Sequence, residues 1–390
     1  MRILFIDWNS FGNEDIIYHL KKAGHKIVYI PFSNENNTRD NEQLQGEIIE
    51  KISSCLPIDF IFSFNYYPIV SQAAMISNVK YVSWVYDSPF IQLYTFSLEN
   101  PCNYVFLFDK AVYLELVKKG FETVYYLPLA ANVERYDSLP YVPSKIKRYH
   151  SSISFVGSLY SEKKNQLYNR LETVSNYTKG FLEALISCQK RIYGEFLLEK
   201  CLTEKVLTDM ILSYPVTPSP DGFENVSWTY AHYFLARKTT EIERQEILSM
   251  LSQQYSIALY TKEPSPFLPQ VDNRGEIDYY TQMPFVFKNS KINLNITLRS
   301  IQTGIPLRAM DIMGCGGFLL TNFQADFLDF FQPDIDFVYY EDYEDLIEKT
   351  NYYLTHEKER LQIAKKGYEK VKQYHNYPVR IEEIIHCVNS

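Results

Sequence analysis

The sequence predicts an α/β protein of two doubly wound domains, each built on a parallel β-sheet. The first observation behind this prediction is length, because 390 residues are too many for one ordinary hydrophobic core. The second is that short apolar runs alternate with helical segments, a rhythm that produces right-handed βαβ units and parallel sheets. The third is composition: 46% hydrophobic and 22% charged residues indicate a packed chain.

The first domain is expected over residues 1–130. Its predicted strands are short apolar runs, most of which end in a polar residue or a turn. These runs are Arg2–Asp7, Lys26–Pro31, Asp59–Phe64, Tyr81–Tyr86, Tyr104–Phe108 and Thr123–Leu127. Helices are expected over Glu14–Ala23, Glu42–Ser54 and Ala111–Lys119, the first and last of them closed by a glycine.

A proline-containing linker over residues 131–150 leads to the second domain, expected over residues 151–375. Its predicted strands are Ile153–Val156, Ser256–Tyr260, Lys291–Ile296 and Phe318–Thr321. A helical insertion of about residues 162–251 separates the first two. Later helices are expected at Tyr279–Lys288, Pro306–Met313, Tyr343–Thr355 and Glu357–Tyr374, and residues 376–390 form a last helix that packs back toward the first domain.

Charge and composition exclude several classes of function. The net charge is −8 and no stripe of lysine and arginine is present, which argues against nucleic acid or an anionic membrane as partner. No apolar run reaches the ~18 residues of a membrane helix. Neither the six cysteines nor the seven histidines have metal-ligand spacing. We therefore expect a cytoplasmic protein without a metal or other cofactor.

The strongest functional pattern lies between Ser290 and Leu320, which read as strand, loop, helix, tight turn and strand. Gly304 lets the backbone approach a ligand closely. Pro306 suits the first position of a helix, where no N–H is needed. The free N–H groups of that first turn and the helix dipole together form an anion site.

Three side chains of this segment are candidates for binding a nucleotide. Arg299 and Arg308 would neutralise a diphosphate, with Arg308 in a catalytic role as well. Asp311, three residues after Arg308 on the same helix face, would accept hydrogen bonds from ribose hydroxyls. The alternative is a surface salt bridge between Arg308 and Asp311. On the functional interpretation, Asp311→Ala weakens nucleotide binding with little loss of folding.

Other strand ends of the second domain carry further candidates. Gly157 and Ser158 follow its first strand and would bring backbone N–H groups near the donor phosphates. Tyr260 ends the next strand and would frame the nucleobase. An ordinary strand-end turn is the alternative interpretation of Gly157 and Ser158.

The first domain carries the candidates for binding a second substrate, which would be the acceptor of a transferred group. Asn9 and Gly12 follow its first strand, and Asn65 and Tyr66 would line an acceptor pocket. Asp87 follows the fourth strand and is the candidate general base, which would deprotonate an acceptor hydroxyl in an inverting enzyme. An Asx-turn before Pro89 is the alternative for Asp87.

Several runs of the sequence together form a recognisable set. They are Arg308…Asp311…Gly-Cys-Gly-Gly-Phe-Leu-Leu, Asp342-Tyr-Glu-Asp-Leu-Ile, His356-Glu-Lys-Glu-Arg360, His375-Asn-Tyr-Pro-Val-Arg380, Phe155-Val-Gly157-Ser158, Trp84-Val-Tyr-Asp87-Ser-Pro and Leu127-Pro-Leu-Ala130. With these runs the chain resembles the spore-maturation CgeB-like glycosyltransferases. The likeness covers most of the chain and is densest over Ile292–Arg380.

The resemblance implies a GT-B fold, which is two Rossmann-like domains. It also implies a nucleotide-sugar donor bound by the C-terminal domain and an acceptor bound by the N-terminal one. Many relatives in the wider GT-B group have two glutamates eight residues apart, where this chain has Thr303 and Asp311.

The predicted function is therefore metal-independent transfer of a sugar from a nucleotide sugar to a hydroxyl group of a protein or cell-surface glycan. A sugar-nucleotide epimerase or a phosphorylase on the same fold is one alternative. A non-catalytic nucleotide-sugar binding protein is another, since a fold alone does not fix chemistry.

Overall fold

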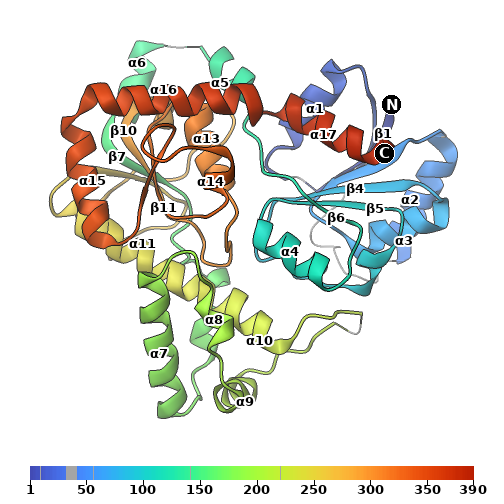
Figure 1. Cartoon of the computed structure of the whole chain (residues 1–390), viewed down its shortest axis with the longest axis horizontal. Helices are drawn as coiled ribbons and strands as arrows, with labels where there is room; N and C mark the ends of the chain where they lie inside the picture. The colour runs from blue at the N-terminus through green and yellow to red at the C-terminus, as the bar shows by residue number, and fades with distance from the viewer. Residues whose placement is uncertain (9, 32–41, 56, 141, 220) are drawn as a thin grey trace. The chain divides into compact units, whose positions relative to one another are not determined.

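The computed structural model describes residues 1–8, 10–31, 42–55, 57–140, 142–219 and 221–390. The chain divides into two compact units (Figure 1). Unit 1 comprises Met1–Ala130, Pro218–Glu224 and His375–Ser390; unit 2 comprises Ala131–Thr217 and Asn225–Tyr374. In the described ranges each unit contains one six-stranded sheet whose strands all pair in parallel, which confirms the predicted fold class.

Unit 1 has the strand order β2-β1-β3-β4-β5-β6. Its strands are β1 (Arg2–Asp7), β2 (Lys26–Pro31), β3 (Phe60–Phe64), β4 (Lys80–Val85), β5 (Asn103–Leu107) and β6 (Val124–Tyr126). Its helices are α1 (Asn13–Lys22), α2 (Glu42–Cys55), α3 (Pro68–Ser77), α4 (Lys110–Lys118) and α17 (Tyr377–Asn389), with 3₁₀ turns at Ile91–Leu93 and Phe96–Glu99. α17 packs on α1, where the rings of His19 and Tyr377 stack with centroids 5.9 Å apart.

Unit 2 has the strand order β12-β11-β10-β7-β8-β9. Its strands are β7 (Ser151–Val156), β8 (Ile257–Tyr260), β9 (Asp272–Asn273), β10 (Ser290–Asn295), β11 (Leu319–Asn322) and β12 (Val338–Tyr340). The helices outside the β7–β8 connection are α5 (Val133–Ser138), α6 (Pro143–Ile146), α12 (Met283–Asn289), α13 (Leu307–Gly314), α14 (Phe327–Phe330), α15 (Tyr343–Thr355) and α16 (Glu357–Tyr374).

The connection from β7 to β8 is helical and has a hydrophobic core of its own. It contains α7 (Asn176–Arg191), α8 (Leu197–Lys200), α9 (Glu204–Ser213), α10 (Val226–Thr229), a π-helix (Tyr230–Leu235) and α11 (Ala236–Ser252), with Pro218–Glu224 assigned to unit 1. None of the helices in the described ranges is long and apolar enough to cross a membrane.

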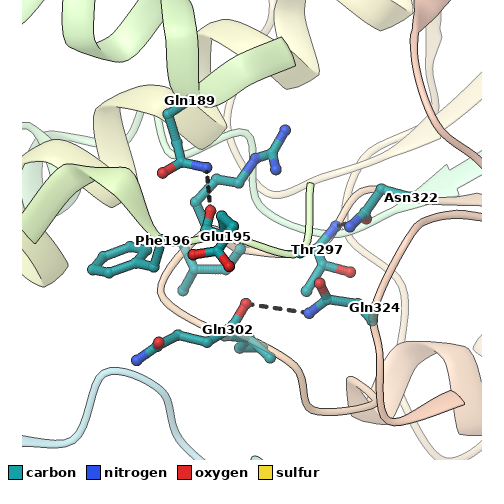
Figure 2. A pocket seen from close by; sticks show the side chains of 11 residues that line it. Gln189, Glu195, Phe196, Thr297, Gln302, Asn322 and Gln324 are labelled. Atoms are coloured by element: carbon teal, nitrogen blue, oxygen red, sulfur yellow. Dashed lines mark hydrogen bonds between the residues drawn. The ribbon is translucent and has the colours of Figure 1, made fainter. Parts of the chain in front are cut away.

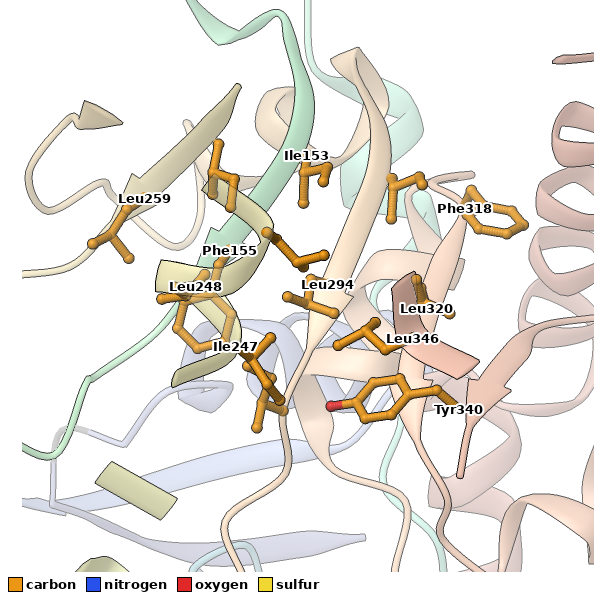
Figure 3. Close-up of a cluster of buried hydrophobic side chains, with 14 of the residues drawn as sticks. Ile153, Phe155, Ile247, Leu248, Leu259, Leu294, Phe318, Leu320, Tyr340 and Leu346 are labelled. Atoms are coloured by element: carbon orange, nitrogen blue, oxygen red, sulfur yellow. The ribbon is translucent and has the colours of Figure 1, made fainter. Parts of the chain in front are cut away.

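The sheet of unit 2 is buried on both faces, as its continuous apolar strands require. On one face Phe155 of β7 and Leu294 of β10 pack against Ile247 and Leu248 of α11 (Figure 3). α11 is thereby fixed against the two central strands, so that its polar residues are carried to the ends of those strands.

The direction in which new strands are added reverses once in each sheet. In unit 1 the reversal lies between β1 and β3, and in unit 2 it lies between β7 and β10. Open parallel sheets bind ligands at the carboxyl ends of the two strands that flank such a switch point. The two switch points are therefore the places to look for function.

Candidate functional site

The carboxyl ends of β7 and β10 are joined by one buried arginine. Arg244, on α11, donates from Nε to the carbonyl oxygen of Ile296 at 3.1 Å, and Nη2 donates to the same oxygen. Its Nη1 donates to the carbonyl oxygen of Ser158 at 2.5 Å. The rings of Phe155 and Tyr160 lie beside it, with centroids 5.3 and 4.9 Å from the guanidinium carbon. The guanidinium of Arg244 thus bridges the two strand ends at the unit 2 switch point.

Arg299 lies in the loop after β10 and is paired with Glu243 of α11. The two side chains form a double hydrogen bond of 2.8 Å on each arm, and both are buried. The backbone carbonyls of Lys190 and Ile192 accept the remaining guanidinium donors at 3.0 and 3.3 Å. These bonds anchor the loop after β10, and the expected contact of Arg299 with a diphosphate stays a prediction.

Asp311 is fully buried on α13, with an exposed fraction of 0%. Its Oδ1 accepts hydrogen bonds from the hydroxyls of Tyr136 at 2.7 Å and Tyr279 at 3.1 Å. Its Oδ2 lies 3.4 Å from Nη1 of Arg308. Burial raises the pKa of Asp311 to about 6. Two tyrosine hydroxyls of the protein thus donate to the oxygen that we expected to accept hydrogen bonds from ribose, and the binding of ribose by Asp311 stays a prediction.

Arg308 keeps part of its side chain in solvent, with 29% exposed. Its Nη1 also contacts the sulfur of Met283, and the ring of Phe287 lies 5.7 Å from its guanidinium carbon. The predicted pairing with Asp311 is present, yet it differs from a surface salt bridge because one partner is wholly buried. Arg308 is thus the exposed end of a buried polar network.

The loop between β10 and α13 borders a pocket at the ends of β10 and β11 (Figure 2). Gln324 donates to the carbonyl oxygens of Ile301 and Gly304 at 3.2 Å each, and Asn322 accepts from the N–H of Thr297 at 2.8 Å. The other residues that line the pocket are Gln189, Gly194, Glu195, Phe196, Leu298, Arg299 and Gln302. The loop that contains Gly304 is therefore held by residues at and just beyond the end of β11.

The other predicted residues of unit 2 lie at neighbouring strand ends. The N–H of Gly157 donates to the carbonyl oxygen of Tyr260 at 3.0 Å. The hydroxyl of Ser158 donates to Glu162 at 2.6 Å. Tyr260 is buried at the end of β8, and its hydroxyl accepts a hydrogen bond from Arg274 at 3.1 Å. These three residues are brought to one edge of the sheet with Arg244.

In unit 1 the structure brings Asn65 and Asp87 together. Asn65 has a left-handed backbone, φ 59°, and its Nδ2 donates to Asp87 at 2.8 Å. Gly12 begins α1 with φ 94°, and a Cβ there would lie 2.8 Å from the hydroxyl oxygen of Tyr377. Tyr66 is fully buried with its hydroxyl 2.8 Å from Ser97, and burial raises its pKa to about 12. Tyr66 thus packs in the core of unit 1, whereas Asn9 lies outside the described residues.

The sequence did not reveal Arg244 and its neighbour Glu243 as site residues. Both lie inside a helical stretch where charged residues usually face solvent, and the strand ends they reach are far away in the chain. The buried tyrosines around Asp311 were missed for the same reason. Among the described residues, no group of three or more His, Cys, Asp or Glu side chains is placed to hold a metal ion.

The comparison that bears most directly on this edge concerns the segment from α11 to α17. Residues 243–386 match the family described as glycosyl transferase-like. The matched segment begins at Glu243 and contains Arg244, the loop after β10 and α13. None of the curated proteins matches the chain in sequence.

The fold of the whole chain is similar to those of several solved structures. Anabaena HepE, determined with UDP and glucose, has a TM-score of 0.57 and 10% identity, over 100% of this chain and 99% of that one. A glycosyltransferase from Rickettsia africae has a TM-score of 0.59 and 12% identity, over 99% and 97%. Sucrose-phosphate synthase of Thermosynechococcus elongatus has a TM-score of 0.58 and 9% identity, over 100% and 98%. These likenesses confirm the GT-B fold.

Proposed function

We propose that the protein is a glycosyltransferase that moves a hexose from a nucleotide sugar to a hydroxyl group of a protein or cell-surface glycan. The observation that carries this proposal is the match of residues 243–386 to the glycosyl transferase-like family. The GT-B fold of the chain supports it. A uridine nucleotide is the first donor to test, because HepE was determined with UDP.

The donor's diphosphate is proposed to lie at the carboxyl edge of the unit 2 sheet. The first turn of α13 presents N–H groups that have no acceptor within the helix, and its dipole favours an anion. Arg308, in that first turn, is partly exposed and would act on the charge that develops on the leaving diphosphate. The arginines of this edge would supply that charge stabilisation without a metal ion.

Asp87 is proposed as the general base. Its carboxylate lies just beyond β4 and is held by the amide of Asn65 at 2.8 Å, so that its position is fixed at a strand end. A positioned carboxylate within reach of an acceptor hydroxyl accelerates transfer by removing the proton as the bond to the sugar forms.

The test is a thermal-shift screen with UDP-, GDP-, ADP-, CDP- and dTDP-sugars, followed by incubation of the best donor with candidate acceptors. A glycosyltransferase releases nucleoside diphosphate only when acceptor is present, apart from slow hydrolysis. If the transfer is independent of metal, as proposed, an excess of chelator leaves the rate unchanged. Formation of a new sugar nucleotide without acceptor would instead identify an epimerase. Stabilisation by a donor with no release on any acceptor would identify a binding protein.

Asp87→Asn tests the base. Its side chain keeps the shape of the original but loses the charge, so the transfer rate should fall about 10²-fold or more while donor binding stays unchanged. Asp109→Asn is a matched control, because Asp109 also follows a strand of unit 1 and caps α4 through the N–H of Ala111.

A further inference from the structure

Arg244 is hydrogen-bonded to no carboxylate in the described part of the chain, although the charges of Glu243 and Glu162 act on it from a distance. Its three guanidinium nitrogens donate to backbone carbonyl oxygens only, those of Ile296 and Ser158, and the adjacent Glu243 is bound to Arg299. The buried side chains of Arg244, Arg299 and Glu243 sum to a charge of +1, and the partly exposed Glu162 carries the opposing charge. A buried cation is costly unless an anion approaches it.

The charge of Arg244 lies at the switch point of unit 2. Arg244 bridges the residues that follow β7 and β10, which are the two strands that flank the switch point of unit 2. Ligands of open parallel sheets bind at such a point. The low-dielectric surroundings of the buried Arg244 strengthen the field of its charge at the adjoining loops.

We infer that Arg244 is a positioning residue that makes this edge selective for the diphosphate of a nucleotide, through its buried charge and not through direct contact. The inference rests on the proposed function, since it names the residue that selects the donor's leaving group. Arg244 fixes Ser158 and Ile296, and its charge favours two phosphates over one and one over none. The sugar and the base of the donor are outside its influence.

Glu162 offers an independent way to change the same field. Its carboxylate accepts hydrogen bonds from Ser158 at 2.6 Å and from Asn165 at 3.0 Å, so it is held beside the Arg244 bridge. Its negative charge opposes that of Arg244 at the strand ends. Removal of the Glu162 charge should therefore strengthen binding of a diphosphate, which is the opposite of the effect of removing Arg244.

The experiment uses the full-length protein and isothermal titration calorimetry. The wild type is first titrated with UDP, GDP, ADP, CDP and dTDP, and the tightest is then compared with its monophosphate and its nucleoside. The variants are Arg244→Gln, Arg244→Lys and Glu162→Gln. Arg237→Gln is the matched control, because Arg237 is an arginine of the same helix that lies over the ring of Tyr233 at 4.9 Å.

In Arg244→Gln the affinity for the diphosphate should fall about tenfold or more, and that for the nucleoside by less than about twofold. Arg244→Lys retains the charge and should retain the ratio of the two affinities within about threefold, although lysine cannot bridge both carbonyls. Glu162→Gln should bind the diphosphate about two- to threefold more tightly. Arg237→Gln should match the wild type.

An equal loss for diphosphate, monophosphate and nucleoside in Arg244→Gln would overturn the inference, because it would show a role in structure alone. So would a lysine variant that behaves like the glutamine variant. If Arg244→Gln does not fold, an unchanged diphosphate affinity in Glu162→Gln overturns the inference instead. A wild type that binds none of the five diphosphates would overturn the proposed function and this inference with it, whereas a binding wild type with unaltered variants would overturn the inference alone.

Discussion

At each of the two switch points, one side chain donates hydrogen bonds that bridge the flanking strands. This side chain is neutral in unit 1 and cationic in unit 2. In unit 1 the indole N–H of Trp8, just beyond β1, donates to the carbonyl oxygen of Phe64 at the end of β3, at 2.6 Å. In unit 2 the guanidinium of Arg244 donates to the carbonyl oxygens beyond β7 and β10. Each bridge ties the two strands between which the sheet reverses.

Because one bridge is neutral and the other is cationic, the strand ends of the two similar sheets differ in charge. The unit 1 edge also contains Asn65 and Asp87, an amide and a carboxylate that suit a neutral hydroxyl compound. The unit 2 edge contains buried arginines that suit an anion. Under the proposed function, the unit 2 edge would take the nucleotide-sugar donor and the unit 1 edge the acceptor.

The largest expected effect on stability comes from disturbing the buried charge pair of unit 2. Glu243→Gln leaves Arg299 buried without its carboxylate, and we expect the free energy of unfolding of unit 2 to fall by about 3–5 kcal/mol. Hydrogen exchange in urea, read by mass spectrometry on peptides of α11 and β10, measures this loss separately from unit 1.

Glu246→Gln is the control for that variant. Glu246 lies on the same helix and pairs with Lys190 at 2.6 Å, but 42% of its side chain is exposed. Its loss should cost no more than about 1 kcal/mol. Equal effects of the two variants would show that the Glu243–Arg299 pair is no more important to folding than a surface pair.

A second variant, Asp311→Asn, tests the buried carboxylate of unit 2 through the pH dependence of stability. Burial raises the folded-state pKa of Asp311 from the ordinary 3.8 to about 6, so the folded protein favours the protonated form. The stability contributed by this group is present below about pH 4 and lost as the pH rises through 6, about 3 kcal/mol in all. Asp311→Asn should lack this loss, so its unfolding midpoint should gain on the wild type between pH 4 and 6.5. Parallel curves of urea midpoint against pH would contradict the expectation.

The fold was predictable from the sequence because its signals are local. The apolar runs at Arg2–Asp7 and Lys26–Pro31 coincide with β1 and β2, and the helices predicted at Tyr343–Thr355 and Glu357–Tyr374 coincide with α15 and α16. Shorter elements gave no such signal: β12 has three residues and β9 two, and both were missed. The helix α3 was also missed, since its apolar residues show little periodicity and it is buried on several sides.

The site was predictable in part, and the reason is again distance along the chain. The loop containing Gly304 and the helix carrying Arg308 were found, because glycine, proline and arginine stand within a few residues of one another. The partners of Arg299 and Asp311 lie 56 and 175 residues away, in Glu243 and Tyr136. No local pattern distinguishes a side chain that faces a ligand from one that faces such a partner.

A third variant tests the unit 1 edge at the turn after β1. Gly12→Ala places a Cβ at a left-handed φ of 94° and 2.8 Å from the hydroxyl oxygen of Tyr377, so we expect a loss of about 1–3 kcal/mol in the stability of unit 1. Gly24→Ala is matched to it, because Gly24 has φ 85° but nothing within 4 Å of a Cβ. The difference between their unfolding free energies isolates the contact with Tyr377, and Gly12→Ala combined with Tyr377→Phe should recover it. A double variant no more stable than Gly12→Ala alone would assign the whole loss to backbone strain.

The smallest expected effect comes from the neutral bridge itself. Trp8→Phe removes the hydrogen bond to Phe64 but keeps an aromatic ring beside Tyr67, so the stability of unit 1 should fall by about 1 kcal/mol. Affinity for a nucleoside diphosphate should not change, because no charge is lost; hydrogen exchange of β1 and β3 and calorimetry measure the two quantities. Wild-type stability in Trp8→Phe would mean that the bridge contributes nothing. If Trp8→Phe instead lowers the diphosphate affinity as much as Arg244→Gln is expected to, the two switch points do not differ in this respect. A neutral hydrogen bond would then affect diphosphate binding as strongly as a buried cation.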